Sequence, residues 1–296
     1  MQLLIKNVIK YLWLRIVPDK IFLKIRYKKN FGRELNLYNP KSLNEKMQWL
    51  KLNDRSELHT ICADKLLVRN YVKECVGEKF LIPLIFNTSN PNLIEQDSLP
   101  NVPFIIKSNN GCGTNFIVRD KANANWQEIR KICTKWLEEN NYYGGKEWQY
   151  KNIKPQIVIE ELLEDSNNKI PNDYKFHCFH GKVKCVYVSI DREGVNKRNI
   201  YDENWNPLFF TWAAPNKDTS KLRGDEIDRP INFDLMVSLA EKLASKFMYV
   251  RVDFYNLNGK IYFGELTFHH GSGFDFILPL EWDYKLGEML KLPMEN

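Results

Sequence analysis

A glycine-rich stretch in the first half of the sequence has the composition of a phosphate-binding loop. The sequence predicts a strand at Phe104–Lys107, the loop at Ser108–Gly113 and a second strand at Phe116–Arg119. Backbone N–H groups in such a loop can fold over phosphates, and Lys107 at the end of the first strand can supply a positive charge. An ordinary hairpin turn accounts for the pattern at least as well, so the loop alone decides nothing.

Two better-known glycine motifs do not fit this loop. Gly111 and Gly113 match the start of a dinucleotide-binding fingerprint, but Phe116 stands at the position of the third glycine. A strand follows the loop, whereas that fingerprint opens a helix. The loop also lacks the Gly-Lys-Ser/Thr ending of a P-loop.

Acidic residues near the C-terminal end lie on two predicted strands. Arg251 and Asp253 alternate along the strand predicted at 250–255 and therefore share one of its faces. On the next strand, predicted at 260–268, the same spacing puts four residues on one face: Ile261, Phe263, Glu265 and Thr267.

The turn between these strands decides whether the carboxylates meet. A two-residue turn at Asn258-Gly259 pairs Asp253 with Gly264 and puts Asp253 and Glu265 on opposite faces. A three-residue loop at 258–260 pairs Asp253 with Glu265 instead. The second register gives a paired oxygen site suited to magnesium. The alternative is a pair of solvated carboxylates on a sheet.

The remaining sequence predicts both helices and strands. Ser42 and Glu45 have the spacing of a capping box and open a helix. Residues 87–101 are rich in Asn, Ser and Pro, which indicates a loop and a domain boundary. Further helices are predicted at 62–76, 125–139, 232–247 and 282–290, and further strands at 80–86, 157–160, 174–179, 182–191 and 206–210. The fold class is therefore α+β with mixed or antiparallel sheets.

Basic side chains gather at the N-terminal end. The 296 residues carry a net charge of +6, but residues 1–33 hold nine basic side chains and one acidic one, which leaves −2 for the remainder. A nearly neutral body argues against a general nucleic-acid binder. Residues 3–17 predict a helix with an apolar stripe beside Lys6 and Lys10. Such a helix either packs on the core or attaches to an anionic membrane surface.

Cysteine usage and hydropathy indicate a cytoplasmic protein. The six cysteines contain no Cys-x-x-Cys pair, as is typical of reduced, scattered thiols. No run of about 18 uncharged apolar residues predicts a transmembrane helix. Charges interrupt the apolar N-terminal residues, unlike those of a signal peptide.

Several short motifs, in order and spacing, resemble the ATP-grasp superfamily, and within it the TupA-like branch associated with teichuronopeptide and surface-polysaccharide synthesis. The likeness covers roughly residues 38–280. It is carried by Ser42-Leu-Asn-Glu-Lys46, Asp64-Lys65, Ile105–Gly113, Val158-Ile-Glu-Glu-Leu162, Asp173-Tyr-Lys-Phe176, Val250-Arg-Val-Asp-Phe254 and Gly264-Glu-Leu-Thr-Phe268.

The resemblance implies that ATP lies between a small glycine-loop lobe and a C-terminal lobe with a mixed or antiparallel sheet. Lys107 would contact the phosphates beneath the loop that carries Gly111 and Gly113, and Lys65 is a weaker candidate for the same contact. The corresponding regions are 1–36, a basic segment; 37–101, a helical or α/β region; 102–163, the small lobe; and 164–296, the C-terminal lobe.

The resemblance also implies how the rest of the nucleotide is held. Glu160 would lie at the adenine amino group, and the backbone of Glu161 and Leu162 would hold the ring. Asp173 would bind the ribose hydroxyls, and Lys175 would contact a phosphate or the hinge edge.

Magnesium and the reacting groups fall on the last two strands in this resemblance. Asp253 and Glu265 match the magnesium carboxylates of the superfamily, while Thr267 stands where a third ligand is usually Asn. Arg251 matches an arginine that stabilises the acyl phosphate and the tetrahedral intermediate, and Arg198 is a looser candidate for a similar role.

The implied activity is ATP-dependent ligation of a carboxylate to an amine through an acyl phosphate. The expected partners are a glycan or glycolipid precursor with a hexuronic acid carboxyl, and an amino acid or amine. Substrate-binding residues are expected in 192–230 and 268–276, and residues 1–33 are expected to reach the inner face of the plasma membrane. The alternatives are a glycosyltransferase of the same pathways, against which the absence of Asp-x-Asp argues, a sugar kinase on the same fold, and a nucleotide-binding scaffold.

Overall fold

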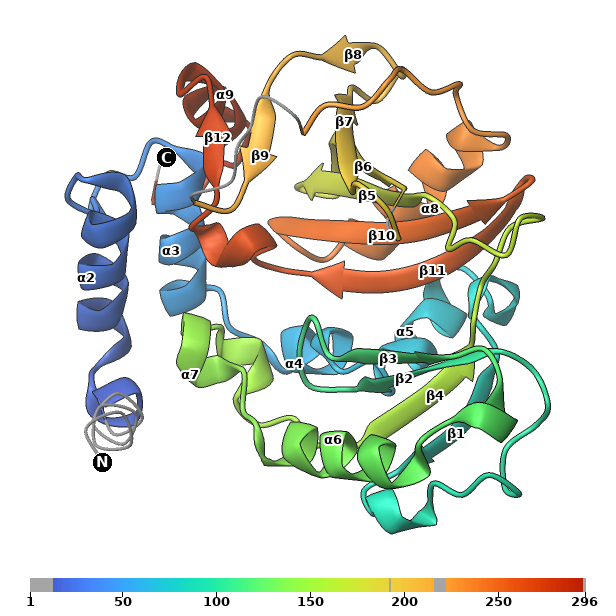
Figure 1. The fold of residues 1–296 in the computed structure, drawn as a ribbon. Coiled ribbons are helices and arrows are strands. Elements are labelled where there is room, and N and C mark those ends of the chain that lie inside the picture. The colour runs from blue at the N-terminus through green and yellow to red at the C-terminus, as the bar shows by residue number, and fades with distance from the viewer. Residues whose placement is uncertain (1–12, 192, 216–221, 295–296) are drawn as a thin grey trace.

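Two β-sheets form the body of the molecule (Figure 1). A cavity lies between them. The computed structural model describes residues 13–191, 193–215 and 222–294. Most of the helix predicted at 3–17 lies outside these ranges. Within them, no helix is long and apolar enough to cross a bilayer. All six cysteines are free thiols.

The smaller sheet has four antiparallel strands in the order β1-β4-β2-β3. Their bounds are Leu84–Thr88 (β1), Phe104–Ser108 (β2), Asn115–Val118 (β3) and Ile157–Glu161 (β4). Helix α6 (Trp126–Glu138) packs against one face through Ile129 and Cys133, which meet the buried Phe104 and Ile106. The strands and the helix predicted at 104–107, 116–119, 125–139 and 157–160 are thereby confirmed. The strand predicted at 80–86 begins only at residue 84, because 78–80 form a short 3-10 turn.

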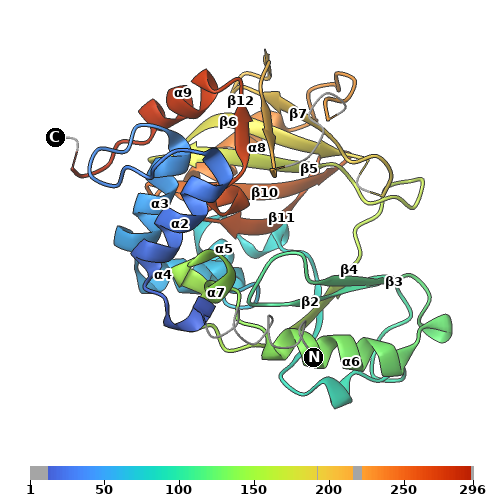
Figure 2. The ribbon, with the colours of Figure 1, turned by 60° about the vertical axis from the view of Figure 1, so that its left-hand side comes forward.

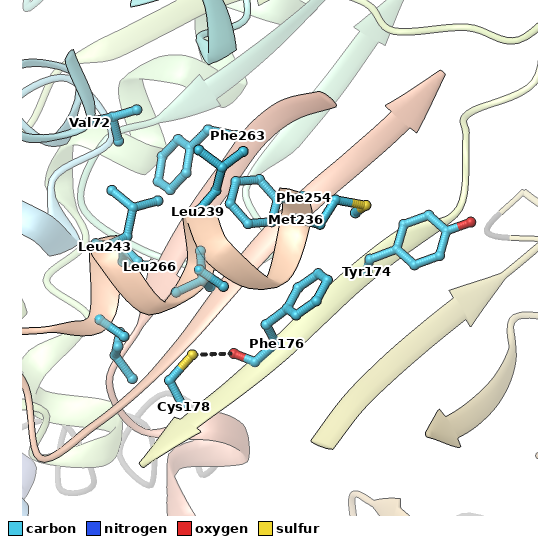
Figure 3. Packing of buried hydrophobic residues seen from close by; sticks show 14 of the residues in the cluster. Val72, Tyr174, Phe176, Cys178, Met236, Leu239, Leu243, Phe254, Phe263 and Leu266 are labelled. Atoms are coloured by element: carbon cyan, nitrogen blue, oxygen red, sulfur yellow. Dashed lines mark hydrogen bonds between the residues drawn. The ribbon is translucent and has the colours of Figure 1, made fainter. Parts of the chain in front are cut away.

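The larger sheet has six antiparallel strands in the order β11-β10-β5-β6-β7-β8. Their bounds are Asp173–Phe179 (β5), Lys182–Ile190 (β6), Lys197–Tyr201 (β7), Pro207–Leu208 (β8), Tyr249–Leu257 (β10) and Lys260–Thr267 (β11). Helix α8 (Phe233–Ala244) covers one face, where Met236, Leu239 and Leu243 pack on Phe176 and Phe254 (Figure 3). The two predicted hairpins and the helix predicted at 232–247 are confirmed, whereas the strand predicted at 206–210 shrinks to β8.

Helices at one side join the two lobes, and Figure 2 shows α2 (Asp19–Phe31) against α3 (Leu43–Asn53). The predicted capping box of α3 forms: the Glu45 N–H donates to Ser42 Oγ, and the Ser42 N–H donates to the Glu45 carboxylate. The helix predicted at 62–76 is wrong as one element. It is split into α4 (Glu57–Ala63) and α5 (Val68–Cys75), because Asp64 Oδ1 accepts from the backbone N–H groups that follow it.

Three further elements border the far face of the larger sheet: β9 (Thr211–Ala213), β12 (Phe276–Leu278) and α9 (Glu281–Met289), which confirms the helix predicted at 282–290. The short helix α7 (Tyr142–Gly145) lies elsewhere, below α3 in Figure 1, where Lys51 Nζ donates to the Gly145 carbonyl oxygen at 2.9 Å. Strands β9 and β12 pair with each other. Together with α3 and α9 they enclose a second apolar cluster around Trp212, Ile277 and Leu286.

A β-bulge in β11 decides which side chains face the cavity. The turn is the two-residue one, since Leu257 pairs with Lys260, but the register shifts after Phe254↔Phe263, and Asp253 pairs with Glu265. The predicted pairing of the carboxylates is therefore right, while the three-residue loop offered as its cause is wrong. The extra residue is Gly264, where a side chain would meet the Asp253 carbonyl oxygen at 3.2 Å.

The bulge also reverses the strand's alternation. Ile261 and Phe263 are buried in the core under α8, whereas Glu265 and Thr267 emerge on the opposite face beside Arg251. The expectation that all four β11 residues share one face is wrong for this reason.

We predict that Gly264→Val lowers the free energy of unfolding by about 1–3 kcal/mol, because its side chain would press on the Asp253 backbone. Gly144→Val is the matched control, since no atom outside its chain neighbours and its own helix backbone lies within 4 Å of the position that its Cβ would occupy. Urea unfolding of both variants measures the effect. Equal stability of the two would contradict the role given to the bulge.

Candidate active site

The cavity between the two sheets has a volume of about 400 Å³ and combines basic, acidic and apolar side chains. This volume lies within the usual range of roughly 300–1,000 Å³ for small-molecule sites. Residues on the side of the smaller sheet are Lys65, Ile82, Ile105, Lys107, Cys112, Gly113, Thr114, Asn115, Ile117, Glu161, Leu162 and Leu163. Residues on the side of the larger sheet are Ile170, Asp173, Lys175, Glu193, Asp253, Tyr255, Gly264 and Glu265.

Charged residues stand in a row across three strands of the larger sheet. Lys175 on β5 lies opposite Asp253 on β10, which lies opposite Glu265 on β11. The neighbouring row contains Arg251. Opposite residues on adjacent strands are close enough for side-chain contact. The sheet register therefore brings together side chains that are far apart in the sequence.

Arg251 is the centre of the hydrogen bonds in these rows. Its Nε and Nη2 donate to the two oxygens of Asp253 at 2.7 and 2.6 Å, and Nη2 also donates to Glu265 Oε1 at 2.7 Å. Burial would lower the Arg251 pKa, but the carboxylates, Asp253 first, outweigh it and raise the pKa. Arg251 therefore stays charged and holds the two acids together.

His270 completes the surroundings of Arg251. Its Nδ1 lies 2.6 Å from Arg251 Nη1. Burial, followed by the charge of Arg251, holds the His270 pKa well below its usual range. A neutral ring with an unprotonated Nδ1 accepts this hydrogen bond.

Lys175 neutralises the other side of the row. Its Nζ contacts Asp173, and it donates to Asp253 Oδ2 at 3.0 Å. Burial would lower the Lys175 pKa, but these two carboxylates raise it. Asp173 and Lys175 thus lie beside the predicted metal carboxylates, at the wall of the cavity.

The glycine loop is fixed from the helical side of the molecule. Lys65 Nζ donates to the Gly111 carbonyl oxygen, and Asn109 Nδ2 donates to Asp64 Oδ2 at 2.9 Å. Gly113 has a φ of 75°, a left-handed conformation that favours glycine. Burial lowers the Lys65 pKa, and a bound phosphate would counter that effect.

A salt bridge holds Lys107 within this wall. Its Nζ lies 3.0 Å from Glu160 Oε2, and Arg69 Nη1 lies 2.9 Å from Glu160 Oε1. Glu160 is not among the residues that line the large cavity, whereas Glu161 and Leu162 are. The adenine contact expected of Glu160 stays a prediction; in this structure its carboxylate positions two cations.

Magnesium fits these residues only with help from a ligand. No group of three or more His, Cys, Asp or Glu side chains in the described ranges is arranged to hold a metal. Magnesium often takes one or two carboxylates and completes its shell with water and phosphate oxygens. Asp253 and Glu265 suit that arrangement, while Thr267 Oγ1 donates to Glu265 Oε1 at 3.1 Å.

Most of the predicted site residues line the large cavity or contact its lining, whereas Arg198 lies in a neighbouring pocket that it shares with Asp173 and Lys175. Lys65, Lys107, Gly113, Glu161, Leu162, Asp173, Lys175, Asp253 and Glu265 line one cavity. Arg251 and Thr267 lie directly behind the carboxylates, and Gly111 is held by Lys65. Arg198 instead lines two neighbouring pockets.

Three features of the site were not expected from the sequence: the ion pair of Arg69, the hydrogen bond of Thr114, and the contact of His270 with Arg251. Arg69 follows Lys65 by four residues, a spacing that can put two cations on one side of a helix start. Thr114 closes the glycine loop through a 2.7 Å hydrogen bond with Ser108. No sequence signal announces the contact made by His270, since it depends on the tertiary fold.

A model of the TupA-like ATP-grasp family matches residues 45–291. The chain belongs to this family. Membership confirms the resemblance found in the sequence and the expected α+β, ATP-grasp fold class. A search of curated proteins gives no match.

Solved structures that are similar to this chain include a D-alanine–D-alanine ligase from Bacillus anthracis, with 18% identity, 70% of this chain and 57% of that chain covered, and a TM-score of 0.38. The complex of a D-alanine–D-alanine ligase from Bacillus anthracis with ATP is 15% identical to this chain, covers 78% of this chain and 63% of that chain, and has a TM-score of 0.45. The ATP-grasp ligase PsnB with a minimal precursor is 13% identical to this chain, with 79% of this chain and 60% of that chain covered, and a TM-score of 0.43. The matched part spans about three fifths of each of these proteins. Such distant likenesses do not bear on the reaction or the substrates.

Proposed function

We propose that this protein is an ATP-dependent carboxylate–amine ligase that works through an acyl phosphate. The observation that supports this proposal best is the composition of one cavity. Lys65 and Lys107 line it from the glycine-loop side, and Asp253 and Glu265 line it from the larger sheet. Cations for phosphate and a carboxylate pair for a metal thus share a single site.

ATP would lie in this cavity with its phosphates toward the two lysines and the backbone of Gly113. The chain at Glu161 and Leu162 would hold the adenine ring, and Asp173 would bind the ribose. The charged row of the larger sheet would then face the γ-phosphate. Asp253 and Glu265 would hold a magnesium ion, which would neutralise charge on the phosphate oxygens.

The chemistry needs no protein nucleophile. A carboxylate oxygen of the substrate bonds to the γ-phosphorus, the bond to the bridging oxygen breaks, and ADP leaves. The amine nitrogen of the second substrate then bonds to the acyl carbon, inorganic phosphate leaves, and the amine proton passes to solvent. Arg251 and Lys175 keep positive charge beside the negative charge that both steps gather.

The carboxylate substrate that we propose is a hexuronic acid of a capsular or other surface polysaccharide, carried as a glycan or glycolipid precursor. Support for this choice is membership of the TupA-like family. The second substrate is an amino acid or another amine.

We predict that purified protein with ATP, magnesium, glucuronic acid and hydroxylamine forms a hydroxamate, because hydroxylamine intercepts an acyl phosphate. The measurement is the coloured iron–hydroxamate complex, with release of ADP and phosphate in equal amounts. Omission of ATP or of glucuronic acid is the control.

Other outcomes separate the alternatives. ADP release with a phosphorylated sugar and no hydroxamate would indicate a kinase. UDP release from a nucleotide sugar without ATP consumption would indicate a glycosyltransferase and contradict the proposal.

We also propose that helix α2 and the residues just before it attach to an anionic lipid surface. Phe22, Leu23 and Tyr27 pack on the body, while Ile21 and Ile25 are each 49% exposed on the outer side. Exposed lysines lie on the same outer side: Lys20, Lys24 and Lys29, together with Lys28, which pairs with the exposed Glu34 at 2.5 Å. This combination supports binding at a lipid surface.

Asp19 lies in α2 but does not offset the charge of the exposed lysines. Asp19, the one acidic residue of α2, contacts Arg55 at 3.0 Å and Tyr142 at 2.6 Å. Its charge is therefore directed toward the body of the protein. An anionic bilayer matches the exposed face, because its headgroups carry negative charge for the lysines and its acyl chains can take up the exposed isoleucines.

We predict that Lys20→Gln with Lys24→Gln weakens binding to vesicles that contain phosphatidylserine by about 30-fold at low salt, from about 1 kcal/mol per lysine. The control pair, Lys131→Gln with Lys135→Gln, makes the same charge change on α6. Vesicle sedimentation compares the two. Equal loss in both pairs, or none in either, would contradict a specific membrane face.

A further inference from the structure

Two pockets continue from the proposed nucleotide site along the larger sheet. The first, of about 230 Å³, shares Asp173 and Lys175 with the large cavity. The second, of about 300 Å³, lies beyond it. Tyr187 and Arg198 line both of these pockets, so they form the wall between them.

Among the residues that the structure describes, Arg198 has no acidic partner at this wall. Its Nε is buried without a hydrogen-bond partner, and in the described ranges its side chain forms no ion pair. Its guanidinium carbon lies 5.8 Å from the centre of the Tyr187 ring. Arg69 and Arg251, by contrast, each bind a carboxylate. Because buried donors in native proteins are nearly always paired, Arg198 is expected to meet an anion from outside the chain.

The second pocket is mostly apolar, and none of the lining residues that the structure describes is acidic. It is lined by Tyr187, Arg198, Ile200, Phe209, Phe210, Thr211, Trp212, Leu222, Arg223, Leu278 and Pro279. Trp212 adds a second buried donor without a partner, its Nε1. A volume of about 300 Å³ is the lower end of the range for ligand pockets, which suits one side chain rather than a lipid tail.

The first pocket has the opposite character. It is lined by Asp173, Lys175, Tyr187, Ser189, Asn196, Arg198, Ala214, His270 and Asp275. Asp173 lies toward the charged row, since it also lines the large cavity, and Arg198 lies toward the apolar pocket, since it also lines that one; Asp275 is a second carboxylate of the polar pocket. An ammonium group and a carboxylate on one small molecule match that order of charges.

We propose that the amine substrate is an α-amino acid with an apolar side chain. Its carboxylate binds Arg198, its side chain fills the apolar pocket, and its amino group lies in the polar pocket toward Asp173 and Asp275. This inference rests on the proposed ligase function and names the substrate class of the same site.

A uronic acid fits the Arg198 wall less well. The carboxylate that is phosphorylated must reach the γ-phosphate beside Asp253 and Glu265, rather than the far end of the neighbouring pockets. A sugar ring would also gain little from the apolar wall at Ile200 and Trp212.

The test is calorimetric binding of phenylalanine and leucine, in both enantiomers, to the full chain with ADP and magnesium. Glutamate, lysine and glycine are the comparison ligands. We expect at least tenfold tighter binding of the apolar amino acids. Binding of glutamate or lysine as tight as that of phenylalanine would overturn the inference.

Variants locate the two contacts. Arg198→Ala should weaken phenylalanine binding at least tenfold, and Phe209→Asp should weaken it without disturbing the core, since Phe209 is 68% exposed. The matched controls are Arg229→Ala, which removes an exposed arginine paired with Asp234, and Phe209→Leu. ADP binding should be unchanged in all four. Unchanged phenylalanine binding by Arg198→Ala would overturn the inference.

The outcome is separable from that of the ligase proposal. If hydroxamate forms but apolar amino acids neither bind nor give an amide, the ligase proposal is supported and the proposed amine substrate class is contradicted. If no hydroxamate forms while phenylalanine binds at Arg198, the amino-acid site is supported and the ligase proposal is contradicted.

Discussion

The β-bulge at Gly264 is the constraint on which the site depends. A strand presents alternate residues to alternate faces, and β11 must give Ile261 and Phe263 to the core and Glu265 to the cavity. One extra residue achieves both, because it reverses the alternation between Phe263 and Glu265. A regular hairpin with the same two-residue turn would leave Asp253 and Glu265 on opposite faces of the sheet.

The carboxylates brought together in this way need cations to hold them, and the protein supplies these cations itself. Arg251 contacts both acids, and Lys175 contacts Asp253 and Asp173. Removing one partner of such a buried network leaves an uncompensated charge, a large cost in a low-dielectric interior. The network therefore keeps the row in place while its members remain beside the cavity. We propose that nucleotide phosphates and magnesium bind against this preformed arrangement, with Lys65 and Lys107 on the opposite wall.

Local patterns in the sequence were sufficient to predict most elements, and they put Lys107, Asp253 and Glu265 among the candidate site residues, whereas Lys65, Asp173 and Lys175 came from the resemblance to a family. Alternation located β10, and the Ser42–Glu45 capping box located the start of α3. The limits arose where contacts between distant residues decide the outcome. Hydrogen bonds to Asp64 split a predicted helix, a bulge replaced a predicted loop, and Glu160 meets Arg69 and Lys107. The pockets around Arg198 combine residues from segments that carry no readable motif, so their composition emerged only from the fold.

We propose that Asp253 and Glu265 form the metal-dependent side of a nucleotide site. The most direct measurement is the affinity for ATP with and without magnesium, in the natural protein and in Glu265→Gln. Magnesium should tighten ATP binding to the natural protein at least tenfold and should have little effect on the variant, which retains the lysine wall. An equal effect of magnesium on both proteins would contradict the account.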